Sequence, residues 1–484
     1  MHGLGRRSAI KILAIRACAI HALDHIIHLR DGTLQESDLR RIVGRALQAR
    51  SPSGIVIHVH GGRVSQKRGR RIAEALHGPY VRAQAYPLFF VWETGDIEAP
   101  LNNLGEILGA VLAKLLFRKV HDKILEKLGG GQVLTPGMKI LNAAPPDEES
   151  LSSDLAQEFA DDPEVNQAIA EARDDYREAT LAPANKMLAH EPPAEHAAIV
   201  NERTAMDLFG TPSPNKAVAL NWIALAIKVA RLVIRVWQRQ HSGRGRPGAV
   251  SAVIVEEVLR EFYLDDVGRI GWWNPMKKDA QDSFDGPASG GVRFLRELHR
   301  QLQSEASVPR ITLVGHSAGS IFLCELLDQA AQILPDLTFD LILEAPAVTC
   351  RRFAHAISKH ENRIGRFRQL AMRDADEASE RSLFFPGSLL YIVSNIFEDA
   401  ADEPLLGMER FFTRESVYRN SAAWADISAC QAFFARKGES AVSWWTLDDL
   451  NADQREGWGH GYFDDGPFIL GKVTALISET PHTP

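Results

Sequence analysis

Cysteine is scarce in this sequence of 484 residues, and its four cysteines lie far apart. Cys18, Cys324, Cys350 and Cys430 form no C-x-x-C pair, and no cluster of cysteines or histidines has a metal-ligand spacing. A disulfide-rich secreted scaffold is therefore excluded, and no metal or other cofactor is expected. Free thiols fit a reducing compartment, so we expect the protein in the cytoplasm.

The sequence also lacks an excess of basic residues. Its 55 Lys and Arg are outnumbered by 62 Asp and Glu, which gives a formal net charge of −7. This balance offers no electrostatic reason to bind nucleic acid, so no such partner is expected. Hydrophobic residues make up 45% and charged residues 24% of the chain. That is ordinary globular usage, and it excludes disorder throughout the chain.

Long apolar runs are missing as well. No window approaches about 18 uncharged apolar residues, so a membrane-spanning helix is not expected. Residues 9–23 resemble the apolar part of a signal peptide, but Lys11 and Arg16 interrupt them. We predict an amphipathic helix there instead. The sequence shows no internal repeat.

Short apolar runs are present, and they predict β-strands. These runs, rich in β-branched and aromatic residues, are 55–60, 85–92, 310–314, 341–345, 367–372 and 441–446. Helical patterns lie between most of them. Strands that alternate with helices predict an α/β fold built on a doubly wound, mostly parallel sheet.

The domain organisation follows from where this alternation breaks. We predict an N-terminal helical segment over 1–53 and one α/β domain over 54–484. A helical, partly acidic insertion at about 100–248 interrupts this domain and is expected to form a cap over the site.

One apolar helix inside the insertion, at 217–237, carries Lys228, Arg231 and Arg235. A buried helix with one basic edge is the favoured interpretation. A lid, or a helix that makes peripheral contact with a membrane surface, is the alternative.

The sequence Gly315-His316-Ser317-Ala318-Gly319 carries the chief chemical signal. It is a G-x-S-x-G motif that directly follows one predicted strand and directly precedes a predicted helix. The serine must occupy a sharp, strained turn so that its hydroxyl projects above the sheet, and the two glycines leave room for neighbouring backbone. Ser317 is therefore the predicted nucleophile, and the following helix points its positive end at the developing oxyanion.

A second motif, His60-Gly61-Gly62, stands at the end of an earlier predicted strand. Small residues allow backbone N–H groups to approach a developing negative charge, so this loop is typical of an oxyanion hole. We expect the donors to be the amide of Ala318 together with that of Gly62 or Arg63.

The base is predicted near the C-terminus, where Gly459 and Gly461 flank His460. A serine nucleophile requires an imidazole within hydrogen-bond reach, and a loop after the last strand is where this chain order places it. His460 occupies that loop. His482 in the terminal tail is the weaker alternative, whereas His58 is expected to be structural, as is His60.

The carboxylate that orients the imidazole is expected after the penultimate strand. In one interpretation that strand is 367–372, and the next residues, 373–377, supply the acid. The interval 341–372 then forms a short strand–helix–strand unit. On this interpretation Asp374 is the predicted acid and Asp376 the alternative.

A second interpretation makes 389–394 the strand, so that Glu398, Asp399 or Asp402 would serve. It requires a much longer crossover connection. Apolar residues within 389–397 also recur at intervals of three and four, which favours a helix. The first interpretation is preferred, and the second remains an alternative.

Together these segments resemble the α/β-hydrolase superfamily, on its lipase and esterase side. The residues that carry the resemblance are those of 60–62 and 315–319, with Asp374 and His460. The loop reads H-G-G-R where many lipases have H-G-G-G. The segments 266–268 and 459–465 look like those of uncharacterised bacterial members, and the resemblance covers about 54–95 and 249–478.

The resemblance implies a serine hydrolase that transfers the acyl group of a carboxylic ester to water through a Ser-His-Asp triad, without a cofactor. The expected partner is a small-molecule ester or a lipid. Alternatives are a thioesterase or amidase with the same triad, a membrane-associated lipase, and a catalytically inactive binding protein that keeps the hydrolase fold. The sequence carries no signature of an oligomeric state.

Overall fold

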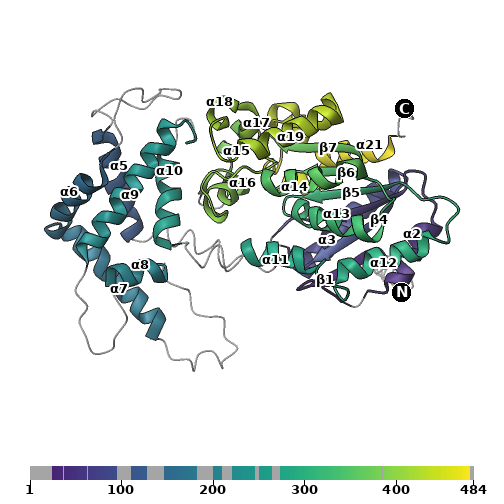
Figure 1. The fold of residues 1–484 in the computed structure, drawn as a ribbon, viewed down its shortest axis with the longest axis horizontal. Coiled ribbons are helices and arrows are strands. Elements are labelled where there is room, and N and C mark those ends of the chain that lie inside the picture. The colour runs from purple at the N-terminus through teal and green to yellow at the C-terminus, as the bar shows by residue number, and fades with distance from the viewer. Residues whose placement is uncertain are drawn as a thin grey trace, which may run out of the picture.

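An eight-stranded sheet forms the core of the larger part of the computed structural model, on the right in Figure 1. The residues described are 24–35, 37–62, 64–94, 111–127, 146–181, 200–209, 221–245, 250–263, 273–382 and 385–479. The strands are β1 (Ile26–Arg30), β2 (Thr33–Leu34), β3 (Ile55–Val59), β4 (Tyr86–Trp92), β5 (Ile311–His316), β6 (Phe339–Glu344), β7 (Ile364–Met372) and β10 (Val442–Trp445). Their order is β10-β7-β6-β5-β3-β4-β1-β2, and every neighbouring pair is parallel except β1 with β2. The predicted α/β class with a mostly parallel sheet is confirmed.

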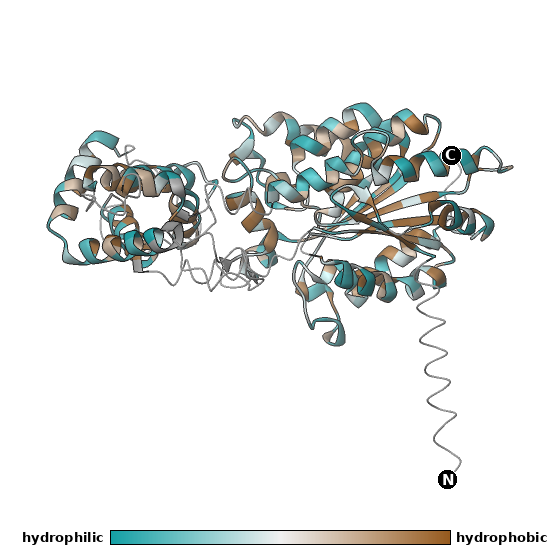
Figure 2. Ribbon diagram, turned by 90° about the horizontal axis from the view of Figure 1, so that it is seen from below, coloured by the Kyte–Doolittle hydropathy of each residue, from teal (hydrophilic) through white to brown (hydrophobic). Residues whose placement is uncertain are grey.

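Helices cover both faces of this sheet. Successive side chains of a strand point to opposite faces, so a strand of mostly apolar residues needs a covering on each face. Ile55, Ile57 and Val59 of β3 belong to one apolar cluster, and Val56 belongs to another. Figure 2 shows the strands mostly in the hydrophobic colour. The first cluster includes residues of α2 (Leu39–Gln48), α12 (Gly290–Leu302), α13 (Gly319–Ile333) and α14 (Cys350–His360). The second includes residues of α3 (Gln66–Arg82), α20 (Tyr462–Asp465) and α21 (Pro467–Ser478).

The N-terminal prediction needs a correction. Residues 24–53 are not a separate helical segment, because β1 pairs in parallel with β4 and joins the main sheet. β1 (IIHLR) has two β-branched residues, against four in the equally long β3 (IVIHV), so its sequence is too weak a signal to identify a strand. Residues 1–23, with the predicted amphipathic helix, lie outside the described residues.

A lobe of helices stands beside the sheet domain in both views (Figures 1 and 2). It contains α5 (Val111–Lys127), α6 (Glu148–Ala160), α7 (Pro163–Leu181), α8 (Glu202–Phe209), α9 (Trp222–His241), α10 (Val250–Val258) and the π-helix η2 (Leu259–Tyr263). The described helices of the predicted insertion lie in this lobe, which continues through α10 and η2 beyond the predicted end at 248. A cap over the site stays a prediction. No helix in the described part of the chain is both long and apolar enough to cross a membrane.

The basic edge predicted for α9 is paired with carboxylates inside the lobe. Lys228 Nζ donates to Glu261 at 3.1 Å, and Arg235 donates to the same carboxylate at 2.8 Å. Arg231 donates to Glu148 at 2.8 Å. These ion pairs join α9 to η2 and α6, so they explain the basic residues through packing within the lobe.

The lobe is joined to the sheet domain through the π-helix η5 (Val393–Phe397), which follows α16 (Leu389–Ile392). The Arg260 guanidinium donates to the carbonyls of Asn395, Ile396 and Glu398 at 3.0–3.1 Å. Arg239 donates to the Asn395 side chain at 3.0 Å. Carbonyls at the end of a helix lack partners within it, so these arginines fix the joint.

The other elements are α11 (Asn274–Asp282), α15 (Asp374–Ser379), α17 (Arg410–Thr413), α18 (Glu415–Tyr418), α19 (Trp424–Lys437) and the 3-10 helices η4 (Glu361–Arg363), η6 (Glu439–Ala441), η7 (Leu447–Asp449) and η8 (Ala452–Gln454). β8 (Arg381–Ser382) and β9 (Phe385–Pro386) form a small antiparallel pair. Of these elements, α11 and α15 contribute residues that contact or adjoin the candidate site.

Candidate functional site

Ser317 occupies a strained turn between β5 and α13. Its φ is +50°, in the left-handed region that residues with a side chain rarely adopt. Its amide donates to the carbonyl of Glu344 on the neighbouring strand β6 at 2.8 Å, which ties the turn to the sheet. A strained serine between a parallel strand and a helix is the arrangement that the G-x-S-x-G motif predicts.

The two motif glycines occupy positions where a Cβ would collide with a neighbour, a backbone carbonyl at Gly319 and a leucine side chain at Gly315. A Cβ on Gly319 would stand 2.3 Å from the carbonyl oxygen of Val59, and one on Gly315 would stand 2.7 Å from Leu323 Cδ1. Real Cβ atoms essentially never approach so closely. Each glycine therefore lets β5 turn sharply into α13 against its neighbours.

The H-G-G loop lies beside the serine, because β3 and β5 are adjacent in the sheet. A Cβ on Gly61 would meet Ser317 Cβ at 3.1 Å, and one on Gly62 would meet Met276 Sδ of α11 at 2.7 Å. His60 Nδ1 donates to the Gly61 carbonyl at 2.8 Å, which fixes the turn. Burial lowers the pKa of His60 to about 4, so it is a neutral, structural histidine.

The backbone amides of Ala318 and Gly62 are two of the predicted oxyanion donors. Ala318 is the N-cap of α13, where helix amides have no intrahelical acceptor. Ala318 Cβ lies 3.6 Å from the position of a Cβ on Gly62, so the two residues face each other. Neither amide has a backbone acceptor among the described residues. Arg63, the other predicted donor, lies outside the described residues.

His460 meets the serine, although 143 residues separate them. The Ser317 hydroxyl donates to His460 Nε2 at 2.9 Å, and both residues are buried. Burial, together with the nearby His316, lowers the pKa of His460 well below its ordinary value. The imidazole is therefore neutral, which is the form that accepts a proton.

The predicted acids are placed elsewhere. Asp374 Oδ1 accepts a hydrogen bond from the Tyr391 hydroxyl at 2.6 Å. Asp376 accepts from the amide of Leu447 at 2.7 Å and from Trp458 Nε1 at 2.9 Å. His460 Nδ1 is buried and has no hydrogen-bond partner among the described residues. The prediction of Asp374, with Asp376 as its alternative, is therefore corrected, because these carboxylates bond to other groups.

The carboxylates of the second interpretation also serve other contacts. Glu398 accepts from Trp273 Nε1 at 2.6 Å and from Lys277 Nζ at 3.0 Å, which holds the start of α11. Asp402 lies 3.3 Å from the buried Arg410 guanidinium. The segment 389–397 is helical, as its periodicity predicts.

Sequence reasoning missed Glu380, whose carboxylate accepts from the His460 backbone amide at 3.0 Å. Glu380 follows β7, as Asp374 does, but it lies six residues later, directly after the end of α15. The Gly387 amide donates to the Glu380 backbone carbonyl at 2.6 Å, which helps to fix the backbone of Glu380. The position after the penultimate strand was the available signal. The choice among the carboxylates there depends on how α15 turns.

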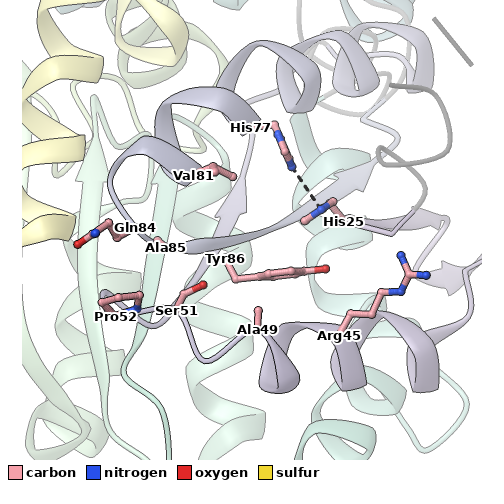
Figure 3. Close-up of a pocket in the computed structure, with 10 residues that line it drawn as sticks. All are labelled: His25, Arg45, Ala49, Ser51, Pro52, His77, Val81, Gln84, Ala85 and Tyr86. Carbon is pink, nitrogen blue, oxygen red and sulfur yellow. Dashed lines mark hydrogen bonds between the residues drawn. The ribbon is translucent and has the colours of Figure 1, made fainter. Parts of the chain in front are cut away.

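A pocket of about 570 Å³ lies near the N-terminal ends of β1, β3 and β4, whereas Ser317 lies at the C-terminal end of β5 (Figure 3). It is lined by residues that include His25, Arg45, His77 and Tyr86, and Tyr86 begins β4. His77 Nε2 lies 3.3 Å from His25 Nε2. Ser317 follows the end of β5, so this pocket is separate from the serine site.

Within the described ranges, no group of three or more His, Cys, Asp or Glu side chains is arranged to hold a metal ion. Cys324, Cys350 and Cys430 are buried free thiols, and Cys18 lies outside the described residues. The site consists of a serine, a histidine, backbone amides and a neighbouring carboxylate. Comparisons of the chain with family models, curated proteins and solved structures find no match.

Proposed function

We propose that this chain is a serine hydrolase of α/β-hydrolase fold that cleaves carboxylic esters by acyl transfer to water. The observation that carries the proposal is the 2.9 Å hydrogen bond from the Ser317 hydroxyl to His460 Nε2 at a left-handed turn. Chain order supports it, because the serine follows β5, Glu380 follows β7, and the histidine follows β10, the last strand of the sheet.

The proposed reaction begins when Ser317 attacks the ester carbonyl carbon and His460 Nε2 takes its proton. The resulting oxyanion receives hydrogen bonds from the amides of Ala318 and Gly62. The C–O bond to the alcohol then breaks, and His460 returns the proton to the leaving oxygen. Water repeats these steps on the acyl-enzyme and releases the carboxylic acid.

Glu380 is the proposed acid of this triad. Its carboxylate lies at the backbone amide of His460, and Nδ1 of the same residue is buried without a partner among the described residues. In the proposed triad a Glu380 oxygen turns from the His460 amide to Nδ1, where it would select the tautomer and stabilise the imidazolium.

The acid assignment predicts a contrast between two variants. Glu380→Gln lowers kcat by about 10³–10⁴-fold, as loss of a triad carboxylate does. Asp374→Asn keeps most of the turnover, because Asp374 bonds to Tyr391. Steady-state hydrolysis of one ester by both purified variants decides between them. A larger loss in Asp374→Asn would contradict the assignment.

The function itself is tested with p-nitrophenyl esters of several chain lengths. Wild type is expected to release nitrophenol, and Ser317→Ala is expected to fall to the uncatalysed rate. Thioesters and amides offered in parallel test the alternative acyl substrates. Equal, slow release by wild type and Ser317→Ala would contradict the proposal and favour a binding protein with an inactive site.

A further inference from the structure

His316, the residue before the nucleophile, makes contacts that the proposed reaction does not use. Its Nε2–H donates to the backbone carbonyl of His460 at 3.3 Å, and the two rings lie 5.3 Å apart. Its other nitrogen, Nδ1, faces Asp464 Oδ1 at 3.6 Å, which is longer than a hydrogen bond, and neither atom has a hydrogen-bond partner among the described residues. Asp464 lies on α20, four residues after His460. His316 therefore links the serine turn to the backbone of the base His460 and faces α20, the helix that follows it.

The protonation of this group follows from its contacts and burial. Because Nε2 faces a carbonyl, Nε2 must carry a proton, and in a neutral imidazole Nδ1 is then an acceptor. Burial lowers the pKa of His316 to about 4. Burial, followed by the charge of Asp465, raises the pKa of Asp464 to about 7. Near neutral pH Asp464 is therefore partly protonated, and in that form its O–H can be directed at Nδ1 across the 3.6 Å that separates the two atoms.

Steric contacts make the ring position specific. A Cβ on Gly61 would lie 2.8 Å from His316 Nδ1, so the H-G-G loop packs against this ring. The His316 side chain is 8% exposed and that of Asp464 is 11% exposed, and both atoms of the 3.6 Å contact are buried. Water therefore competes little for hydrogen bonds to these groups. Removing a hydrogen-bond partner from either group should cost free energy, because the remaining polar atom stays buried.

We propose that His316 is a positioning residue, which holds the His460 backbone through its Nε2–H while Asp464 selects the required tautomer. The proposal rests on the proposed function for the reaction that it serves. Because the hydrogen bond from His316 fixes the position of His460 relative to the Ser317 hydroxyl, it affects the chemical step rather than ester binding.

Isosteric variants separate this role from simple packing. His316→Gln keeps an N–H donor near the position of Nε2, whereas His316→Met fills similar space without a donor. Asp464→Asn keeps a donor toward Nδ1, and Asp464→Leu removes it. We expect His316→Met to lower kcat by about 10–100-fold with little change in KM, as loss of alignment does.

Rescue by the conservative variants is the decisive kinetic result. His316→Gln should recover most of the kcat that His316→Met loses, and Asp464→Asn should exceed Asp464→Leu in the same way. Wild-type kcat in His316→Met, or equal losses in His316→Gln and His316→Met, would overturn the proposal.

A readout without turnover keeps this test apart from the proposed function. In protein labelled with ¹⁵N-histidine, NMR is expected to show the His316 ring as the Nε2–H tautomer, assigned by its loss in His316→Gln. Asp464→Leu should shift that signal toward a tautomer mixture, and an unchanged signal would overturn the role of Asp464. Failure of the proposed function appears separately, as a wild type that neither cleaves esters nor reacts with a fluorophosphonate.

Discussion

Glycine should be tolerated unusually well in place of Ser317. Ser317→Ala and Ser317→Gly both remove the hydroxyl and its hydrogen bond to His460, so they differ only in the Cβ. The left-handed backbone at φ +50° strains any residue that has a Cβ. This strain costs about 1–2 kcal/mol. The free energy of unfolding of the two variants therefore reports the strain directly.

The expected magnitude follows from three opposing terms. Glycine loses about 0.5–1 kcal/mol to backbone entropy, and removal of a buried methyl group costs about 0.8 kcal/mol. Relief of strain offsets both at this turn, so the two variants should have nearly equal stability. Ala330→Gly, at a buried position in the regular helix α13, has no such relief. It should lose about 1.3–1.8 kcal/mol.

Equilibrium urea unfolding, followed by tryptophan fluorescence, measures these differences. The cost of replacing alanine by glycine should differ between the two sites by about 1–2 kcal/mol. Two differences in the free energy of unfolding are compared: Ser317→Ala minus Ser317→Gly, and wild type minus Ala330→Gly. Equal differences would refute the reasoning. Ser317 would then not be in the left-handed conformation, and the strained turn would be refuted.

Three further predictions concern a glycine, the base and a buried ion pair. Gly319→Ala should destabilise the fold by about 1–3 kcal/mol through overpacking, because its Cβ would stand 2.3 Å from a strand carbonyl; Gly471→Ala, which meets nothing within 4 Å, is the matched control in urea unfolding. The lowered pKa of His460 keeps the base neutral as pH falls through 6.5, so kcat/KM should remain constant there and decline only at lower pH; a half-maximum near 6.5 in the pH profile would contradict this. Arg410→Met should cost about 1.5–3 kcal/mol in urea unfolding, because the buried Asp402 carboxylate loses the Arg410 guanidinium but keeps that of Arg244 at 3.3 Å. A loss below about 1 kcal/mol would show that the pair contributes little.

The central sheet could be predicted from the sequence because buried parallel strands are continuous apolar runs. β3 and β5 are such runs, and their ends carry the H-G-G and G-x-S-x-G motifs. Strand adjacency then brings the two motifs together. β1 escaped prediction because only two of its five residues are β-branched, against four of five in β3.

The proposed acid, Glu380, could not be chosen from sequence because several carboxylates follow β7. The first turn of α15 directs Asp374 to Tyr391, whereas Glu380 at the end of that helix reaches the His460 amide. Strand order predicts the segment, but the direction of each side chain depends on the helix that follows. The basic edge of α9 is a similar case, because its partners lie on helices that are distant in the sequence.

Reaction with a fluorophosphonate, followed by peptide mass spectrometry, tests the central claim most directly. The claim is that Ser317 is a nucleophile activated by His460. The account predicts one covalent adduct per chain on Ser317, none in Ser317→Ala, and labelling slowed by about 10³-fold or more in His460→Ala. No adduct in the wild type, or an adduct on another residue, would contradict it.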